Sequence, residues 1–431
     1  MNRPLNVLCI SPRFAPTNEA DTHRLRLLLR HATQAGWCPT VVAVAPECLS
    51  VKQDPWLLEG LPKDLAVHRV AIPRKAWGLS SVFARAWRPM DRKVREILGR
   101  GAFDLVFFST NEFPLTYLAI GWKKDFGVPF CMDFQDPWVN DYYRAHPEVV
   151  PPGGRLKYAL ISQLHRFFER RVVREVSGLL AVSQGYLTAL SKRHGESVAT
   201  KPMLVRPFPA EPAEFDNLPT FRPNELNCWR YIGRGGEDMS FAAAAFFRAW
   251  ARAVDQKLLR QEAIRFEALG TSYANAGAPT LEHHADGLSI RQQVMEHPAR
   301  IPYSAVMGKL SASSALVVFG SNDASYTASK IYPYLLAGKP LLAIFHEQSS
   351  VVTLLRECAG GHLVTFDDAT TLEVLADRIY DVWFSRCGYD HQVALDEKSF
   401  EPYLARRQAM DLQIWFNTML TAHNTGSEMT R

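Results

Sequence analysis

Short runs of apolar residues alternate along the chain with longer segments in which apolar residues recur at helical spacing. The runs at residues 5–10 and 39–45 are typical of buried strands. The segment 21–35 between them predicts a helix that begins with Asp21 as its N-cap and ends at Gly36. Further strands are expected at residues 103–108, 129–133, 179–183, 229–232, 264–269, 315–319 and 341–345, and further helices at 156–176, 241–254, 326–337 and 398–421. Strands that alternate with helices predict parallel sheets with helices on both faces.

A segment rich in proline and acidic residues, at positions 209–223, interrupts this alternation, which then starts again. The chain has 431 residues, which exceeds the usual size of a single hydrophobic core, so two domains are expected. We expect a first domain at residues 1–208, a linker at 209–226 and a second domain at 227–397. A final amphipathic helix at 398–421 is expected to precede a disordered tail.

Composition limits the classes of function. The hydrophobic content of 47% and the charged content of 22% are those of a globular protein, and a net charge of only +5 argues against a dedicated nucleic-acid binder. Seven cysteines without a CxxC pair predict free thiols in a reducing cytoplasm. No secretory signal is visible, and no apolar run reaches the ~18 residues of a membrane span. The isolated pair His283 and His284 predicts no metal site.

The stretch at 315–345 carries the clearest candidate chemistry. Its pattern predicts a strand, a loop, a helix that ends at Gly338, and a second strand. The loop and the first helical turn carry hydroxyls and one ammonium, on Ser325, Tyr326, Thr327, Ser329 and Lys330. Because the N–H groups of a first helical turn lack helical partners, these groups predict an anion site suited to phosphate. The alternative is an ordinary strand–helix–strand unit with a solvated serine and lysine.

The run Tyr-Thr-Ala-Ser-Lys-Ile-Tyr-Pro-Tyr-Leu-Leu-Ala-Gly-Lys-Pro at 326–340 resembles the nucleotide-sugar segment of GT-B glycosyltransferases, especially family 4. The turn Asp-Phe-Gln-Asp-Pro-Trp at 133–138 resembles one found in family members that build bacterial polysaccharides. The resemblance implies an α/β protein with the GT-B fold. In that fold two Rossmann-like, doubly wound domains face a central cleft, and a C-terminal helix crosses back to the first domain.

The resemblance implies a donor site in the second domain. A glycine-rich turn follows the first strand of that domain, where glycines let the backbone approach a diphosphate and Arg234 can hold it bidentately. Lys330 is the second implied cation, and both are expected to act in catalysis by stabilising the leaving diphosphate. Residues 300–303 resemble the short edge that packs against the donor base. The implied donor contacts are Gly233, Gly235, Gly236, Gly270, Ile301, Tyr303, Tyr326, Thr327, Ser329 and Tyr334.

Polar residues also follow strands of the first domain, and ligands of doubly wound sheets bind at the carboxyl ends of strands. The expected acceptor contacts are Arg13, Thr17, Asn18, Glu19, His23, Thr110 and Gln135. Asp133 and Asp136 are expected to orient the acceptor as catalytic carboxylates. Gln135 stands where the family often has histidine or arginine, and it cannot titrate near neutral pH, so we expect it to hydrogen bond only. The alternative for the loop at 11–20 is a plain structural connection.

On the donor side, the sequence departs from the family at three positions. Family 4 commonly has a Glu-x7-Glu motif, and Ser325 and Pro333 occupy its two positions here. A charged acceptor for the donor ribose is therefore missing, which removes a hydrogen bond of about 1.5–3 kcal/mol. The companion lysine of the donor arginine is replaced by Met239.

A basic and aromatic segment at residues 77–95 has two interpretations. It predicts either a contact with an anionic membrane surface or a half-buried helix with a solvated charged face. The first interpretation places the protein in the cytoplasm at the inner face of the membrane.

The resemblance implies a hexosyltransferase that moves a sugar from a nucleotide-sugar co-substrate to a saccharide or lipid-linked acceptor. It implies retention of anomeric configuration, with no metal and no cofactor. Two alternatives remain open, a nucleotide-sugar 2-epimerase and a non-enzymatic GT-B module that binds a sugar nucleotide or a partner.

Overall fold

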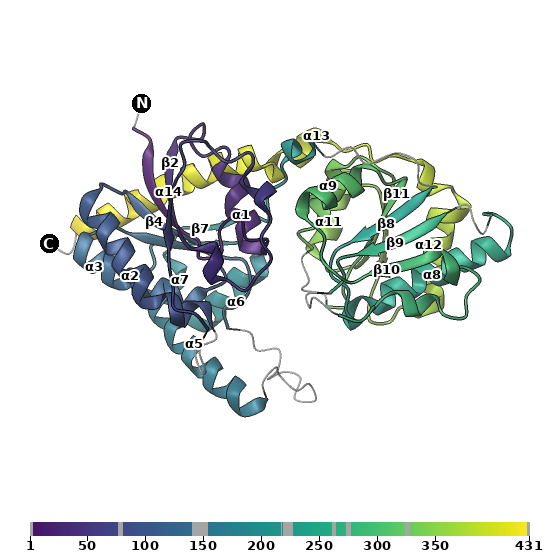
Figure 1. The fold of residues 1–431 in the computed structure, drawn as a ribbon, viewed down its shortest axis with the longest axis horizontal. Coiled ribbons are helices and arrows are strands. Elements are labelled where there is room, and N and C mark those ends of the chain that lie inside the picture. The colour runs from purple at the N-terminus through teal and green to yellow at the C-terminus, as the bar shows by residue number, and fades with distance from the viewer. Residues whose placement is uncertain are drawn as a thin grey trace. The chain divides into compact units, whose positions relative to one another are not determined.

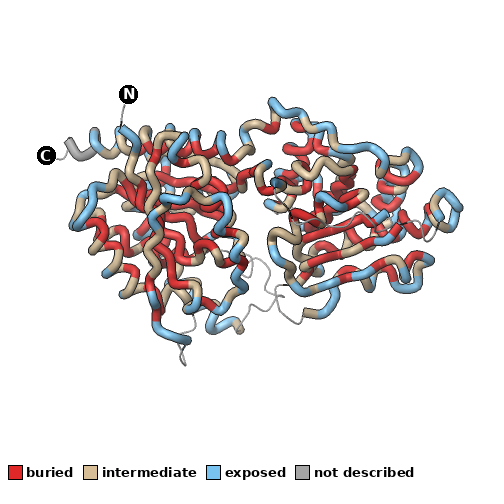
Figure 2. Tube along the Cα trace, turned by 45° about the horizontal axis from the view of Figure 1, so that its top comes forward, coloured by how far each residue is buried: buried red, intermediate tan, exposed pale blue. Residues whose placement is uncertain are grey.

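The computed structural model describes residues 3–75, 81–139, 154–216, 218, 227–260, 264–272, 277–323 and 328–428. The chain forms two compact units (Figure 1). Unit 1 comprises Met1–Pro209 and Ala405–Arg431, and unit 2 comprises Ala210–Leu404. The strands of both units are largely buried, whereas pale blue exposed residues follow the outer helices and loops (Figure 2).

Within the described residues, unit 1 holds a parallel sheet of seven strands in the order β3-β2-β1-β4-β5-β6-β7. The strands are β1 (Leu5–Ile10), β2 (Trp37–Val44), β3 (Ala66–Val70), β4 (Leu105–Ser109), β5 (Phe130–Phe134), β6 (Gly178–Ala181) and β7 (Met203–Val205). Its helices include α1 (Ala20–Leu29), α2 (Val82–Arg100), α3 (Leu118–Phe126), α5 (Arg155–Glu175), α6 (Gln184–His194), α7 (Glu196–Ala199) and α14 (Ala405–Glu428).

The described part of unit 2 holds a parallel sheet of six strands in the order β10-β9-β8-β11-β12-β13. The strands are β8 (Cys228–Ile232), β9 (Arg265–Leu269), β10 (Val294–His297), β11 (Ala315–Phe319), β12 (Leu341–His346) and β13 (His362–Phe366). Its helices include α8 (Ser240–Asp255), α9 (Tyr303–Ser311), α10 (Ile331–Leu336), α11 (Ser350–Glu357), α12 (Leu372–Ile379) and α13 (Glu397–Phe400). Both strand orders are those of doubly wound sheets, as the alternating sequence pattern predicts.

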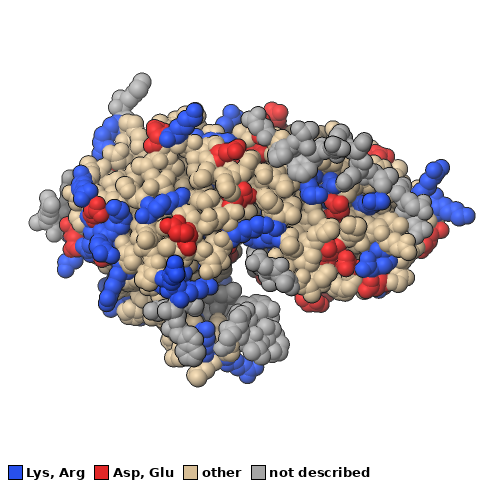
Figure 3. Space-filling model, in the orientation of Figure 1, with Lys and Arg blue, Asp and Glu red and all other residues tan. Residues whose placement is uncertain are grey.

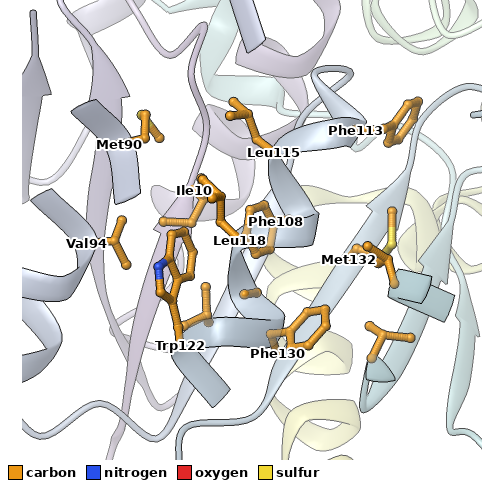
Figure 4. Close-up of a cluster of buried hydrophobic side chains, with 14 of the residues drawn as sticks. Ile10, Met90, Val94, Phe108, Phe113, Leu115, Leu118, Trp122, Phe130 and Met132 are labelled. Atoms are coloured by element: carbon orange, nitrogen blue, oxygen red, sulfur yellow. The ribbon is translucent and has the colours of Figure 1, made fainter. Parts of the chain in front are cut away.

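The larger core of unit 1 lies between one face of the sheet and helices α2, α3 and α5 (Figure 4). Phe108 of β4 stacks on Trp122 of α3 with ring centroids 5.9 Å apart, and both side chains are almost fully buried. Replacing such a phenylalanine by alanine costs about 3–5 kcal/mol of stability because the cavity does not fully collapse.

The last helix, α14, packs on the opposite face of the unit 1 sheet. Trp37 donates its indole N–H to the Ala409 carbonyl at 3.2 Å and meets Phe416 edge to face at 5.7 Å. A methyl group on Gly178 would lie 2.8 Å from the Trp415 ring, so glycine permits the close approach of the helix to β6. The apolar side of α14 is thus buried in unit 1, whereas residues 398–404 of the expected final helix belong to unit 2.

Several expected boundaries need correction. The first helix ends at Leu29 rather than at residue 35, and α14 begins at Ala405 and continues to Glu428, beyond the expected end at 421. The helix expected at 326–337 is the shorter α10, whose third residue is Pro333. Because that position lies in the first turn, where an N–H has no helical partner, the proline does not break the helix.

Two elements differ in kind from the expectation. Residues 300–303 form no strand, because Ile301 lies in a loop and Tyr303 begins α9; the strand just before them, β10, is one of the two edge strands of the unit 2 sheet. The region 54–101 contains the strand β3 before α2. Of the basic and aromatic segment at 77–95, residues 82–95 belong to α2, which is half-buried because Met90, Val94 and Ile97 lie in the core. Residues 77–80 lie outside the described residues.

Candidate functional site

Each sheet has one point at which neighbouring strands send their connections in opposite directions. In unit 2 this point lies between β8 and β11, and in unit 1 it lies between β1 and β4. The loops that leave such neighbouring strands separate, and the crevice left between them is where doubly wound proteins bind ligands. Both points carry residues that the sequence nominates.

In unit 2, the turn after β8 and the start of α10 come together through Lys330. The Lys330 ammonium donates a hydrogen bond to the Tyr231 hydroxyl and lies 4.2 Å from the centre of the Tyr231 ring. Gly233 has a φ of +154°, and a methyl group there would lie 2.8 Å from Lys330 Cδ. Glycine is therefore required, both for the backbone conformation and to leave room for the lysine.

A second cation lies beside the first. Arg234 donates two hydrogen bonds to Asp238, at 2.9 and 2.7 Å, with about a quarter to a third of each side chain exposed. Burial raises the pKa of Asp238, but hydrogen bonds from Arg234 and Ser321 outweigh it, so that pKa lies below its ordinary value. Asp238 is thus ionised and holds the guanidinium in place.

The electrostatic balance of this site favours an added anion. Burial, together with the nearby charge of Arg234, lowers the pKa of Lys330 well below its ordinary value, and Asp238 offsets only part of this effect. Both cationic groups therefore interact with the same carboxylate, that of Asp238. An anion bound between them would lower the free energy of the charged lysine, because its attraction replaces the stabilisation by water that burial removes.

Tyr231 and Asp238 were not nominated from the sequence. The Tyr231 hydroxyl donates to the Arg234 carbonyl and lies 3.1 Å from Met239 Sδ. Met239 is fully buried. It occupies the position at which the family that the sequence resembles has a lysine, and here that position belongs to the core. A carboxylate four residues after an arginine was the available signal for Asp238.

Other predicted donor residues differ in their surroundings. Tyr334 is buried, and its hydroxyl bonds both the N–H and, at 3.0 Å, the carbonyl of Ile232, so it fixes α10 to β8 rather than facing a ligand. Ser329 is exposed at the turn before α10. Gly270 ends β9 with its N–H bonded to the His297 carbonyl at 2.8 Å. The predicted contacts Tyr326 and Thr327 lie outside the described residues, as does Ser325.

A buried glutamate shapes the turn opposite the glycines. Glu296, at the end of β10, accepts backbone N–H bonds from Thr280, Leu281 and Glu282 at 2.7–2.9 Å. The Thr280 hydroxyl lies 2.2 Å from where a methyl group on Gly235 would be, so the two turns touch. Sequence reasoning missed this carboxylate because its partners, three backbone N–H groups and the Thr271 hydroxyl, lie 14 to 25 positions away in the chain.

In unit 1, a polar chain links the loop after β1 to the loop after β4. Arg13 pairs with Glu112 at 2.6 Å, and the Glu112 N–H donates to the Thr110 hydroxyl at 2.9 Å. That hydroxyl is 3.5 Å from Asp21, whose carboxylate also accepts the Thr22 N–H at 3.1 Å. The structure therefore brings two predicted residues, Arg13 and Thr110, to the same place.

Asp21 titrates unusually in this setting. Burial raises the pKa of Asp21 to about 7, Arg13 partly lowers it, and the nearby Glu19 raises it further. The sequence nominated Asp21 only as an N-cap, whereas Glu19 holds that position in the structure. Nearby, His23 and Asn18 are linked by a 3.0 Å hydrogen bond, and Thr17 is buried in a short bridge to Gln53.

The two predicted carboxylates at the end of β5 have different environments. Asp133 is buried and paired with the fully buried Arg24 at 2.8 Å, and Arg24 also donates to the Pro207 carbonyl. This arrangement does not fit the expected role of Asp133 in orienting an acceptor, because its oxygens serve the ion pair. Gln135 donates to the Ser109 hydroxyl at 3.0 Å, and Asp136 is exposed. Asp136 is therefore the accessible carboxylate of the pair.

Among the residues that the structure describes, no cluster of three or more histidine, cysteine or acidic side chains is arranged to hold a metal ion. Within the same residues, no helix is both long and apolar enough to cross a membrane.

The two doubly wound sheets, with a last helix that belongs to unit 1, give the chain the GT-B fold, as the resemblance implies. No protein-family model matches the sequence, and no curated protein matches it. The fold is similar to that of Alr3699/HepE from Anabaena, solved with UDP and glucose (TM-score 0.56, 13% identity, 99% of each chain covered). It is also similar to α,α-trehalose 6-phosphate synthase from Burkholderia multivorans (TM-score 0.57, 11% identity, 100% of each chain). A third similar structure is WaaG, a glycosyltransferase involved in lipopolysaccharide biosynthesis (TM-score 0.55, 14% identity, 98% of this chain and 99% of WaaG).

Proposed function

We propose that this protein is a glycosyltransferase that uses a nucleotide-sugar donor. The observation that carries the proposal is the pair of cations, Lys330 and Arg234, held over a glycine turn at the switch point of the unit 2 sheet. A nucleoside diphosphate is the ligand class that suits closely spaced cations beside a backbone that a phosphate can approach. The neighbouring structures, which include one holding UDP, support this assignment of the ligand.

In the proposed reaction the leaving diphosphate gains negative charge as the bond to the sugar breaks. Lys330 and Arg234 would stabilise that charge, because both are fixed before the reaction and need no rearrangement of solvent. The proposal assigns no step to a metal or a cofactor, and it keeps the retention of anomeric configuration that the family resemblance implies. The transferred group is proposed to be a hexosyl residue.

The acceptor is proposed to be a saccharide or a lipid-linked saccharide that meets the polar groups of unit 1. Asp136 is the exposed carboxylate at the end of β5, and Arg13 with Thr110 lies at the switch point of that sheet. Carboxylate, guanidinium and hydroxyl groups of this kind can hydrogen bond to sugar hydroxyls. The proposed place of action is the cytoplasm, which the cysteine usage of the sequence favours.

A thermal-shift screen tests the donor assignment. UDP, GDP, ADP and their sugar conjugates are added to the wild type and to the double variant Lys330→Ala, Arg234→Ala. We expect one nucleoside diphosphate to stabilise the wild type but not the variant. If none stabilises the wild type at millimolar concentration, the proposed donor site is wrong. The sugar conjugate of the stabilising nucleoside diphosphate is then incubated with candidate acceptors in the presence of EDTA. The mass and the anomeric NMR signals of the product test for metal-independent transfer.

A second function, a non-enzymatic module that binds a sugar nucleotide, is favoured by a specific feature. The family's companion lysine is absent, since Met239 is buried against Tyr231, and Pro333 replaces the ribose-binding glutamate. Nucleotide binding without turnover for any acceptor or water would support this alternative. A change of the sugar without an acceptor would instead indicate a nucleotide-sugar 2-epimerase.

A further inference from the structure

An open groove lies between α2 and α5 in unit 1. Its volume is about 590 Å³, and its walls are mainly apolar, with Phe83 and Trp87 from α2 facing Leu164 and Phe168 from α5. The Trp87 and Phe168 rings are 5.8 Å apart, which joins the two helices at this place. Three arginines, Arg74, Arg88 and Arg92, also line the groove and are exposed.

Helix α5 continues from this groove with an uncovered apolar stripe. In the helix, only Glu169, Val172 and Val173, near the C-terminal end, are buried, and Figure 1 shows the helix extending beyond the sheet. Leu156 and Leu160 are 78% and 67% exposed, and Leu164 and Phe167 continue the same line at 43% and 49%. Residues spaced by three and four lie on one face of a helix, so these four form one continuous stripe.

Positive charge surrounds both features. Helices α2 and α5 each carry six Lys or Arg and two acidic residues, whereas the whole chain has 49 basic and 44 acidic residues. Glu169, one of the two acids of α5, is buried in a pair with Arg193 and His194 and does not offset the surface charge. Figure 3 shows Lys and Arg gathered over the part of unit 1 where Figure 1 places α2.

We propose that the α5 stripe and the α2–α5 groove together form a docking surface for an anionic phospholipid membrane. The stripe enters the boundary between head groups and acyl chains, and the flanking arginines pair with lipid phosphates, as for an amphipathic helix that lies in the interface. The groove holds the first part of one acyl chain, with its arginines at the phosphate. The expectation of membrane contact at residues 77–95 thus moves mainly to α5, because the apolar face of α2 is used by the core.

Charge decides between this occupant and a second copy of the chain. A symmetric contact through α5 would bring two helices with the same excess of four positive charges together, and like charges at such a contact are repulsive. An anionic lipid surface instead attracts each basic residue and buries the exposed leucines at the same time.

Vesicle co-sedimentation of the full chain tests the proposal. Wild type is mixed with vesicles of phosphatidylcholine alone and with vesicles containing phosphatidylglycerol. We expect binding to the anionic vesicles only, weakened by salt. Since one basic residue near an anionic surface strengthens binding about fivefold, the double variant Arg88→Glu, Arg92→Glu should bind at least about 25-fold more weakly. Leu160→Asp with Leu164→Asp should lower binding at least about tenfold, because two exposed leucines lose their place in the apolar layer.

Unit 2 supplies matched controls. Lys257→Glu with Arg260→Glu makes the same charge change on exposed residues, and Leu258→Asp replaces a leucine with the same 43% exposure as Leu164. These variants should bind anionic vesicles as the wild type does. Equal loss in the controls, or no binding of the wild type, overturns the proposal, and so does self-association, measured by light scattering, that Leu160→Asp abolishes. The Tm shift caused by the nucleotide should be unchanged in the α2 and α5 variants. The membrane-docking proposal can therefore fail without failure of the proposed donor site, and the reverse also holds.

Discussion

Replacing Lys330 by methionine removes one partly buried positive charge from unit 2 and keeps most of the volume of the side chain. In the protein without ligand, burial and the nearby charge of Arg234 raise the free energy of the charged lysine, so its pKa lies well below the ordinary value. Lys330 donates a hydrogen bond to the Tyr231 hydroxyl, and that hydroxyl retains the Arg234 carbonyl as acceptor when the lysine is lost. We therefore expect Lys330→Met to be at least as stable as the wild type without ligand.

The same change should weaken nucleotide binding. A hydrogen bond to a charged group contributes about 1.5–3 kcal/mol, so the Kd for the stabilising nucleoside diphosphate should rise about 10- to 150-fold. At a concentration of 100 times the wild-type Kd, binding stabilises the wild type by about 2.7 kcal/mol and the variant by about 1.4 kcal/mol or less. For a unit of this size the Tm shift then falls from roughly 5–11 °C to roughly 5 °C or below.

The assay is differential scanning fluorimetry with and without the nucleotide, and isothermal titration calorimetry gives the Kd. The control is Lys309→Met in the same unit, a lysine 28% exposed and 3.6 Å from Glu267, which should keep the full shift. A full nucleotide shift in Lys330→Met would refute the assignment of this ammonium to the diphosphate. A lower Tm of the empty variant would refute the argument that the buried charge is costly.

Three further predictions concern one glycine of unit 2 and two buried carboxylates of unit 1. Gly233→Ala should abolish the nucleotide shift, because the added methyl group lies 2.8 Å from Lys330 Cδ at a φ that disfavours alanine; binding equal to wild type by calorimetry would contradict this. Asp133→Ala should lower the unfolding free energy in urea by about 3–5 kcal/mol because a buried guanidinium loses its partner, whereas exposed Asp136→Asn should change it by less than about 0.5 kcal/mol. Burial raises the pKa of Asp21 from 3.8 to about 7, so the folded state keeps a proton that the unfolded state loses between these pH values, and stability falls as pH rises through that window. Wild type should therefore lose up to roughly 4 kcal/mol between pH 4 and pH 8, and Asp21→Asn should lose much less; equal pH profiles would show that Asp21 is not the group responsible.

The hydrophobic pattern determined the architecture to a large extent. Continuous apolar runs such as residues 315–319 have one way to bury both faces, in the middle of a parallel sheet, so the strands and the doubly wound class could be predicted. Gly338, with a φ of +65°, ends its helix region as predicted, because its sequence signal is local. Boundaries were less certain, and the early end of α1 at Leu29 has no glycine or proline to mark it.

The proposed donor turn could also be predicted from the sequence, since Arg234 lies in a glycine turn and Lys330 lies at a helix start. The tertiary structure decided which of these side chains bond to other residues of the protein and which can face a ligand. Asp133 and Tyr334 look like ligand contacts in the sequence, but residues more than 100 positions away, Arg24 and Ile232, occupy them. The pKa of Asp21 and the exposed stripe of α5 likewise depend on burial. Burial is a sum over contacts between distant parts of the chain, whereas a local pattern records only the preference of each residue.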